Sequence, residues 1–332
     1  MTLPAVTVLM SVYNGDAWLC EAVESILGQT FTGFEFFIID DASTDASFEI
    51  LARYADRDSR IRLFRNEASL GLAASLNECL PLVQTPYIAR MDADDIALPS
   101  RFARQLHFLE RHQEISVCGA WIECFGVSVG IGRRPVEHGA ITASLLFFNP
   151  IAHPTVMART AALQRVQYDP AFARAQDYEL WSRMILDHGL RFHNLPVVLL
   201  RYRTHPSDYF LPWHVEILRR NVQRLGIKPS DRELRLHEAL SLGRYAEAMR
   251  ESRLEDVVNW LNTLFAASVA TSLVATRMFE PVLQYSFLQC LSYAPLKVIW
   301  RVMPFVRFVS QSRMRFWGRM ARCVLKKTLC HD

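Results

Sequence analysis

The chain has 332 residues, of which 51% are hydrophobic and 21% are charged, and this composition argues against disorder of the whole chain. The formal net charge of +3 is unevenly distributed, because residues 1–100 hold fifteen Asp and Glu against six Arg, whereas residues 297–332 hold nine Lys and Arg against one Asp. A phosphate-bearing ligand would be repelled by the acidic first part unless a cation, such as a bound metal ion, intervened.

Short apolar runs, each followed by a polar cluster, predict four strands in the first hundred residues: Ala5–Met10, Phe34–Ile39, Ile61–Phe64 and Tyr87–Met91. Helical spacing between the runs predicts helices over Asp16–Leu27, Ala46–Tyr54 and Ala73–Leu82. Asp16 is a candidate cap for the first helix, and Thr44 or Asp45 for the second. The alternation of strands and helices indicates an α/β fold, with a mostly parallel sheet flanked by helices.

The pattern becomes mixed after Pro99. It predicts a helix to about Arg111, a strand over Ile115–Ile122, an apolar segment Ile141–Phe148, a strand near Thr155–Ala158, a helix from Asp177 to about Asp187 and a strand over Val197–Tyr202. The sequence after Pro212 is helical in pattern.

Ligands of such sheets bind beyond the carboxyl ends of the strands, so the residues after each apolar run are candidates for a binding site. They are Ser11-Val12-Tyr13-Asn14, Asp40-Asp41-Ala42-Ser43-Thr44-Asp45, Asn66 and Asp92-Ala93-Asp94-Asp95. Turns favour the same residue types, but four polar clusters on one edge favour a functional site. Asp92 and Asp94 could share a hard divalent cation that bridges the phosphates of a diphosphate. We expect Asp95 to cap the following helix instead.

Two further groups have both a chemical and a structural interpretation. A carboxylate at Asp41 could accept the ring N–H of a pyrimidine on which Tyr13 stacks, or could simply shape a turn. Asp177 lies near the start of a helix, where the dipole favours its charged form. It could serve as a general base towards a hydroxyl group, or cap the helix.

Five motifs together resemble the family 2 glycosyltransferases, in order and in approximate spacing, over residues 5–210. They are Val8-Leu9-Met10-Ser11-Val12-Tyr13-Asn14, Ile38-Ile39-Asp40-Asp41-Ala42-Ser43-Thr44-Asp45, Met91-Asp92-Ala93-Asp94-Asp95, His153-Pro154-Thr155 and Gln176-Asp177-Tyr178-Glu179-Leu180-Trp181. Each motif alone is weak, whereas five in order are specific. One departure is Gln176, where family members commonly have Glu.

The resemblance implies a GT-A fold, a nucleotide-diphosphate sugar donor such as a UDP-sugar, and inversion at the anomeric carbon. It implies base contacts from Tyr13 and Asp41, with Ser11 and Asn66 in the same nucleotide site. Asp92 would contact the ribose or the metal shell, Asp94 would bind Mn²⁺ or Mg²⁺, and Asp177 would be the general base. His205 would face the metal, with a surface loop histidine as an equally weighted alternative.

The same resemblance implies a catalytic domain over residues 1–212, with a nucleotide-sugar-binding half at 1–98 and an acceptor-binding half at 99–212. A helical region over 213–332 would follow. The acceptor would be a hydroxyl of a glycan or lipid-linked glycan of a bacterial surface polysaccharide, such as a lipopolysaccharide.

The C-terminal region is expected to associate with a membrane surface. Residues 257–276 are uncharged but interrupted by polar residues, so we interpret them as a buried or interfacial helix rather than a span. The tail from Lys297 to Leu329 interleaves aromatic and basic side chains: Trp300, Phe305, Phe308, Phe316 and Trp317 with Arg301, Arg307, Arg313, Arg315, Arg319, Arg322, Lys326 and Lys327. This pattern suits an anionic lipid interface, with a solvated helix as the alternative and nucleic-acid binding disfavoured.

Other functional classes fit the sequence less well. A sugar nucleotidyltransferase usually needs a Gly-rich basic phosphate loop near its N-terminus, and a nicotinamide dehydrogenase needs GxGxxG after the first strand; neither is present. A non-catalytic binding or scaffold subunit of the same fold is opposed by the intact Asp92, Asp94 and Asp177. The seven cysteines lack CxxC spacing and no signal peptide is apparent, so we expect reduced thiols and a cytoplasmic protein at the inner face of the plasma membrane.

Overall fold

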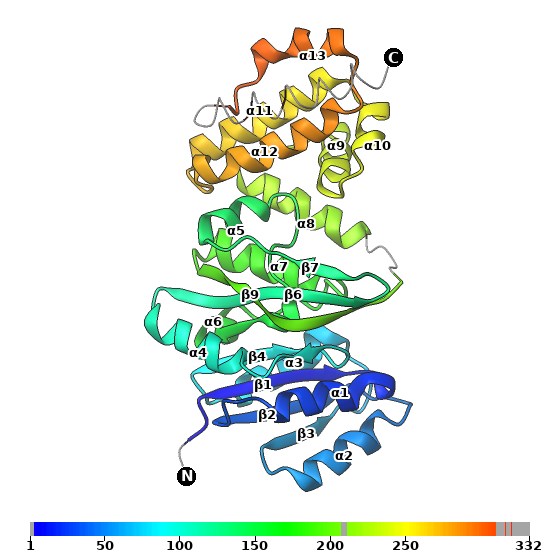
Figure 1. Cartoon of the computed structure of the whole chain (residues 1–332), viewed down its shortest axis with the longest axis vertical. Helices are drawn as coiled ribbons and strands as arrows, with labels where there is room; N and C mark the ends of the chain where they lie inside the picture. Colours follow the sequence, from blue (N-terminus) through cyan, green and yellow to red (C-terminus); the bar gives the residue numbers. More distant parts are fainter. Residues whose placement is uncertain (1–2, 207–210, 310–315, 317–319, 321–332) are drawn as a thin grey trace. The chain divides into compact units, whose positions relative to one another are not determined.

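The computed structural model describes residues 3–206 and 211–309, together with residues 316 and 320 (Figure 1). The chain divides into two compact units. The first comprises residues 1–141 and 150–213, and the second comprises residues 142–149 and 214–332. The short segment 142–149 thus belongs to the second unit although the chain on both sides of it belongs to the first.

The first unit is built on a mixed sheet, which has nine strands in the described part of the chain, in the order β3-β2-β1-β4-β8-β6-β9-β5, with β7 paired to β6. The strands are β1 (Val6–Val12), β2 (Phe34–Asp40), β3 (Ile61–Arg65), β4 (Tyr87–Met91), β5 (Ile96–Ala97), β6 (Ile115–Gly126), β7 (Gly130–Gly132), β8 (Met157–Arg159) and β9 (Arg191–Thr204). The first four strands are parallel to one another, β8 runs antiparallel to β4 and β6, and β6 is parallel to β9. The predicted strands of the first hundred residues are confirmed.

Helices flank this sheet (Figure 1). They are α1 (Asp16–Leu27), α2 (Ser47–Arg57), α3 (Leu72–Cys79), α4 (Arg101–Arg111), α6 (Thr160–Val166) and α7 (Gln176–Ser182), with short turns at Leu80–Leu82, His153–Thr155 and Arg183–Asp187. Val8, Val12 and Ile38 from β1 and β2 are buried in one hydrophobic cluster with Leu19 and Val23 of α1. The α/β fold with a mostly parallel sheet is therefore confirmed.

Asp16 does not cap α1, contrary to the prediction. The residue before the helix is Gly15, and no side chain caps it. Asp45 instead holds both helix starts, since its carboxylate accepts hydrogen bonds from the backbone N–H of Asp16 (3.1 Å) and from that of Ser47 (2.9 Å). The residue before α2 is Ala46, and α2 has no side-chain cap, so neither Thr44 nor Asp45 caps it as predicted.

The second unit is helical, as predicted for the end of the chain. It contains α9 (Asp231–Ser241), α10 (Tyr245–Glu251), α11 (Leu254–Thr271), α12 (Thr276–Leu291), α13 (Leu296–Val302) and a turn at Met303–Phe305. The chain passes between the units within α5 (His138–Ser144) and α8 (Leu211–Arg224).

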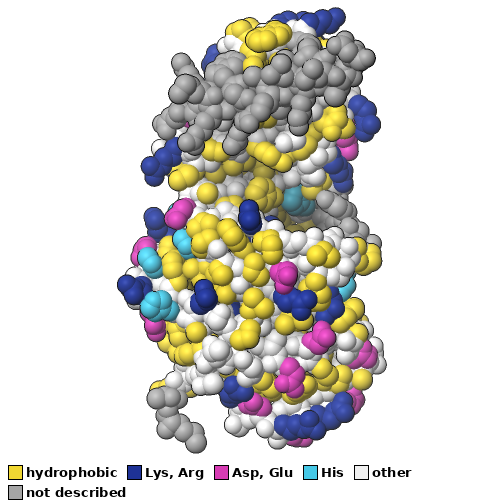
Figure 2. Space-filling view, in the orientation of Figure 1, with side chains coloured by type: hydrophobic (Ala, Val, Ile, Leu, Met, Phe, Trp, Pro, Cys, Tyr) yellow, Lys and Arg dark blue, Asp and Glu magenta, His cyan; other side chains and the backbone are white. Residues whose placement is uncertain are grey.

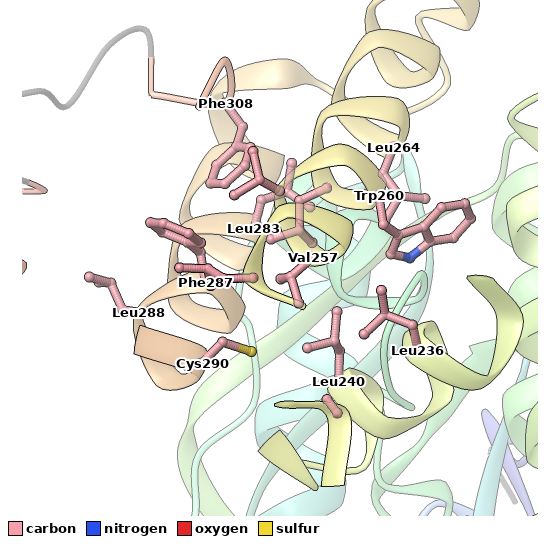
Figure 3. Close-up of a cluster of buried hydrophobic side chains, with 14 of the residues drawn as sticks. Leu236, Leu240, Val257, Trp260, Leu264, Leu283, Phe287, Leu288, Cys290 and Phe308 are labelled. Atoms are coloured by element: carbon pink, nitrogen blue, oxygen red, sulfur yellow. The ribbon is translucent and has the colours of Figure 1, made fainter. Parts of the chain in front are cut away.

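Buried side chains from α9, α11 and α12 form the core of this unit (Figure 3). Trp260 lies in this core, and its indole Nε1 donates to Nδ1 of His237 at 3.1 Å. The other ring nitrogen of His237 lies 2.7 Å from the carbonyl of Leu146, which can only accept. Nε2 therefore carries the proton, and burial lowers the pKa of His237 to about 4, so the imidazole is neutral.

The uncharged stretch 257–276 is not one continuous helix. α11 ends at Thr271, Ser272 has a φ of 53°, and α12 begins at Thr276. None of the helices in the described part of the chain combines the length and the hydropathy that crossing a bilayer requires. Of the predicted basic tail, Arg313, Arg315, Trp317, Arg319, Arg322, Lys326 and Lys327 lie outside the described residues.

Candidate active site

The loops after β1 and β2 are bonded to each other at the carboxyl edge of the sheet. The backbone N–H of Asn14 donates to Oγ of Ser43 (3.1 Å), and the side chain of Asn14 accepts from the backbone N–H of Thr44 (2.8 Å). Asn14 has a φ of 50°, a conformation that Asn adopts more readily than most residues. Tyr13 is 56% exposed and Ser11 is half-buried at this edge. The Tyr13 ring is therefore accessible on a fixed backbone.

Asp41 is 2% exposed and organises the loop that follows β3. Its carboxylate accepts five hydrogen bonds of 2.7–2.9 Å, from the side chains of Asn66, Ser69 and Ser75 and from the backbone N–H groups of Leu70 and Gly71. Burial tends to raise the pKa of Asp41, but these donors stabilise the charged form and the net pKa is lowered. Two predicted nucleotide residues, Asp41 and Asn66, are thus in direct contact.

Asp92 follows β4 and is paired with an arginine from inside that strand. Nη2 of Arg90 lies 2.5 Å from Oδ1 of Asp92, and Arg90 is almost fully buried. Burial raises the pKa of Asp92, and the neighbouring Asp94 raises it further, whereas Arg90 opposes both effects. Asp92 is therefore an ion-pair partner within the protein before any ligand binds.

Asp94 meets the end of β9, the last long strand of the sheet. Its Oδ2 lies 2.7 Å from Nε2 of His205, and both side chains are partly exposed. Arg203 holds the arrangement, because its Nε donates to the backbone carbonyl of Asp94 (2.9 Å) and its Nη2 pairs with Glu21 of α1 (2.8 Å). Trp18, also on α1, lies against His205, with the ring centroids 5.1 Å apart. The sequence-predicted pair Asp94 and His205 is thus brought together.

The prediction that Asp95 caps the following helix is wrong. Helix α4 begins at Arg101 after Ser100, without a side-chain cap. Asp95 is instead 1% exposed, and its Oδ1 accepts the backbone N–H of Arg203 at 2.7 Å. Burial, together with Asp92 and Asp94, raises its pKa well above the usual range. The capping pattern in the sequence was misleading because the partner of Asp95 is on a strand more than a hundred residues away.

Asp177 lies in the first turn of α7 and does not cap it. The residue preceding the helix is Ala175, which has a φ of 62°, and the helix has no side-chain cap. Oδ1 of Asp177 accepts the backbone N–H of Tyr178 at 2.8 Å. A non-glycine residue in the left-handed region is strained, and such strain often accompanies functional sites. The backbone therefore turns sharply just before Asp177.

The acidic residues from β4 and α7 share one aromatic neighbour, Tyr202 of β9. Burial raises the pKa of Tyr202, and the negative charges of Asp92, Asp94, Asp95 and Asp177 raise it further. The phenol therefore keeps its proton among the carboxylates. Asp-x-Asp and Asp177, which are more than eighty residues apart in sequence, thus lie within electrostatic range of one side chain.

The His153-Pro154-Thr155 motif lies beneath this acidic group. Nε2 of His153 is 2.8 Å from the hydroxyl of Tyr168, and both residues are buried. Burial lowers the pKa of His153 well below its ordinary value, and the positive charge of Arg90 lowers it further. His153 is therefore a neutral supporting residue rather than a charged one.

The donor set around Asp94 fits a hard divalent cation. Asp94 supplies a carboxylate and His205 supplies an imidazole, ligands that Mn²⁺ accepts. Oδ2 of Asp95 is buried and has no hydrogen-bond partner. Within the described residues, no group of three or more His, Cys, Asp or Glu is arranged to hold a metal ion. Any cation here would therefore need ligands from a bound molecule as well.

Sequence reasoning missed several residues that build the site. Arg203 and Trp18 fix the Asp94–His205 pair, and Tyr202 joins the two acidic groups. For Tyr202 and Arg203, the only signal in the sequence was that they stand close to His205 in Tyr202-Arg203-Thr204-His205. Trp18 carried no signal, because it reads as part of an amphipathic helix.

Comparison with known proteins identifies relatives. The family described as Glycosyl transferase family 2 matches residues 7–172. MJ1057 of Methanocaldococcus jannaschii, an uncharacterized glycosyltransferase, is 33% identical over 217 residues, which cover 64% of this chain and 74% of that protein. WfaP of Escherichia coli, named a UDP-Glc:alpha-D-GlcNAc-diphosphoundecaprenol beta-1,3-glucosyltransferase, is 29% identical over 232 residues, which cover 68% of this chain and 89% of that protein.

A solved structure has a similar fold. The structure of S. aureus TarS residues 1–349 in complex with UDP gives a TM-score of 0.56 at 17% identity, and the match covers 87% of this chain and 90% of that one. At this identity the likeness concerns the fold alone.

We predict that Asp41→Asn lowers the free energy of unfolding by about 2 kcal/mol, because an amide nitrogen would face donors that now bond a carboxylate. Amide hydrogen exchange at Leu70 and Gly71 should accelerate at the same time. Urea unfolding and exchange measurements check both. Asp56→Asn, at an exposed position of α2, is the control and should change stability by less than about 0.5 kcal/mol. Equal behaviour of the two variants would contradict the structural role of Asp41.

Proposed function

This chain belongs to glycosyltransferase family 2, and we propose that it transfers a sugar, with inversion, from a UDP-sugar to a hydroxyl of a lipid-linked glycan in the synthesis of a surface polysaccharide. It is a glycosyltransferase with the GT-A fold, as its family and its structural relatives have. The observation that carries the proposal is the contact of Asp94 with His205 at 2.7 Å, at an edge where Asp92, Asp94 and Asp177 all act electrostatically on Tyr202. A binding subunit without activity would have no need for this convergence.

In the proposed reaction, Asp177 takes the proton from the acceptor hydroxyl. The acceptor oxygen forms a bond to the anomeric carbon as the bond from that carbon to the diphosphate oxygen breaks. The electron pair of the broken bond leaves with the nucleoside diphosphate, and attack from the opposite face inverts the anomeric centre. Tyr202, which keeps its proton, can donate a hydrogen bond within this acidic group.

Asp94 and His205 would hold Mn²⁺ or Mg²⁺, with Asp92 nearby, and the donor diphosphate would complete the coordination. A bound cation would supply positive charge to the leaving diphosphate. The arrangement in the protein supports this role, because the Asp94 and His205 side chains already meet at 2.7 Å and are partly exposed. Arg203 and Trp18 would keep His205 in position when it exchanges its hydrogen bond for a metal ion.

The nucleotide would lie against Ser11, Tyr13, Asp41 and Asn66, with the base stacked on the exposed Tyr13 ring. A base N–H would be a sixth donor to Asp41, whereas a carboxylate offers about four lone-pair positions. The five present donors already exceed that number, so a base N–H would have to replace at least one of them. The Ser69 hydroxyl is the donor that can rotate away at least cost, so we propose that it gives up its bond to Asp41 when the base binds.

We further propose that residues 1–212 are the catalytic domain, with donor contacts in residues 1–98 and acceptor contacts in residues 99–212. The acceptor class is supported by the relative WfaP, whose name specifies a sugar on diphosphoundecaprenol. Residues 213–332 would form a helical region that associates with a membrane surface.

The described part of this helical region supports contact with lipid. Lys297, Trp300 and Arg301 are spaced to share one face of α13, and all three are exposed. Trp300 is 60% exposed and Phe305, in the next turn, is 62% exposed. Figure 2 shows hydrophobic side chains beside Lys and Arg side chains at the end of the second unit that carries α13. Aromatic and basic side chains together suit an anionic membrane interface.

We predict that Asp94→Ala weakens manganese-dependent binding of UDP at least about tenfold, because it removes one of two protein ligands. Titration calorimetry with and without Mn²⁺ checks this. Asp56→Ala, which changes an exposed carboxylate of α2, is the matched control and should bind as the unaltered protein does. Unchanged metal dependence in Asp94→Ala would rule out the metal assignment.

We predict that Asp177→Asn lowers kcat by about 10²- to 10⁴-fold, because the amide cannot accept the hydroxyl proton. The affinity for UDP should stay the same, since Asp177 does not contact the donor in this proposal. The measurement is release of UDP with a synthetic lipid diphosphate-linked N-acetylglucosamine as acceptor. Asp187→Asn, an exposed carboxylate after the same helix, should keep full activity. Full activity of Asp177→Asn would mean that another group is the base.

We predict that the double variant Trp300→Ala, Phe305→Ala binds phosphatidylglycerol-containing vesicles about tenfold more weakly than the unaltered protein, because two exposed aromatic anchors are lost. Vesicle sedimentation checks this. Val129→Ala removes an apolar side chain that is 85% exposed in the first unit, and should leave vesicle binding unchanged. If the double variant bound as tightly as the unaltered protein, α13 would not be the contact.

A further inference from the structure

Arg134 lies near the proposed base and has been given no role so far. It follows β7, the short strand that pairs with β6, and its backbone carbonyl accepts the indole N–H of Trp121 at 3.0 Å. Its guanidinium interacts electrostatically with Cys124, Tyr202 and Asp177. Cys124 and Tyr202 are partners in the β6–β9 register. The guanidinium therefore lies within electrostatic range of these two strands and of Asp177 at the start of α7.

The guanidinium of Arg134 has no ion-pair partner among the residues that the structure describes. Its Nε is buried without a hydrogen-bond partner, and no ion pair of Arg134 is present among the described residues. Of the other arginines at the acidic edge, Arg203 pairs with Glu21, and Arg90 pairs with Asp92 through Nη2 while its Nε and Nη1 are buried without hydrogen-bond partners. Burial lowers the pKa of Arg134, which shows that holding this charge here costs free energy. A half-buried arginine of this kind is suited to an anionic ligand.

No lysine of residues 1–227 could take the place of Arg134 as a phosphate ligand, because these residues contain no lysine. Fixed positive charge in this part of the chain is therefore carried by arginine. The planar guanidinium binds phosphate oxygens through two parallel N–H groups, which a single ammonium cannot do.

We propose that Arg134 binds the phosphate group that links the acceptor sugar to its lipid carrier. This inference rests on the proposed function, because it takes Asp177 to be the group that receives the acceptor hydroxyl. When a hydroxyl of the acceptor sugar lies at Asp177, only the sugar ring separates that hydroxyl from the phosphate on the anomeric carbon of the same sugar. Arg134, which lies within electrostatic range of Asp177 and has no ion-pair partner among the described residues, is placed for that phosphate, whereas the donor diphosphate belongs to the Asp94–His205 side of the edge.

A competing role for Arg134 is to stabilise the charged form of Asp177, since a nearby cation favours an ionised carboxylate. The two roles differ in what they predict for acceptors. A residue that only tunes the base affects every acceptor equally, whereas a phosphate ligand affects only acceptors that carry phosphate. Comparison of a charged and an uncharged acceptor therefore separates them.

The test measures equilibrium binding of two probes to the full chain in the presence of UDP and Mn²⁺. One probe is phenoxyundecyl diphosphate-linked N-acetylglucosamine, and the other is the uncharged phenoxyundecyl glycoside of the same sugar. Arg134→Gln should weaken binding of the diphosphate probe about 10- to 100-fold and change binding of the uncharged probe less than about twofold. Arg133→Gln removes an exposed charge from the neighbouring residue and should change neither. The affinity of Arg134→Gln for UDP confirms that the variant is folded.

Equal weakening of both probes by Arg134→Gln would overturn the proposal in favour of a role in tuning the base. Equal binding of both probes by the unaltered protein would overturn it as well. Sugar transfer to the diphosphate probe is followed separately by release of UDP. A preference for the diphosphate probe that depends on Arg134, without any transfer from any UDP-sugar, would support the phosphate site and count against the proposed function.

Discussion

The repulsion between carboxylates at one edge of the sheet is the constraint on which this site depends. Asp92, Asp94, Asp95 and Asp177 all act on Tyr202, and their charges raise its pKa. Like charges held this close destabilise the folded protein unless protons, arginines or a cation compensate. Burial raises the pKa values of Asp92 and Asp95 most, and the neighbouring carboxylates raise them further. A divalent cation bound at this edge would offset the repulsion between the carboxylates, and the same cation would bind the donor diphosphate.

The end of β9 is the element that turns this edge into a site. β9 pairs with β5 as well as with β6, and so reaches the loop that carries Asp-x-Asp. Arg203 bonds that loop through its backbone N–H and its side chain, and it also pairs with Glu21 of α1. Three segments that are far apart in sequence are thereby joined. His205 follows Arg203 by two residues and therefore lies beside Asp94, because Arg203 is bonded to the loop that carries Asp94.

The sequence was informative where the signal is local and less so where it depends on pairing. Strands of the first half were predicted because each is a short apolar run, and their polar ends were found because parallel strands share an edge. Asp95 was predicted to cap a helix because its true partner, Arg203, is distant in the chain, and no local sequence pattern indicates a hydrogen bond between the two residues. The same reason hid Trp18 and Tyr202. The roles of Asp94 and Asp177 remain predictions, now with a geometry that brings them to one neighbour.

The distribution of positive charge explains how one acidic edge could bind the phosphates of both the donor and the acceptor at separate places. Arg203 and Arg90 form ion pairs with carboxylates, and Arg90 is also almost fully buried, so neither is placed to bind a phosphate from solution directly. The donor diphosphate would then depend on an exchangeable metal ion held at Asp94. Arg134 is permanently charged and unpaired within the described residues, so it would attract a phosphate with or without metal. The site would therefore distinguish the two substrates by their cations: the fixed guanidinium of Arg134 would bind the acceptor phosphate, and the exchangeable metal ion would bind the donor diphosphate.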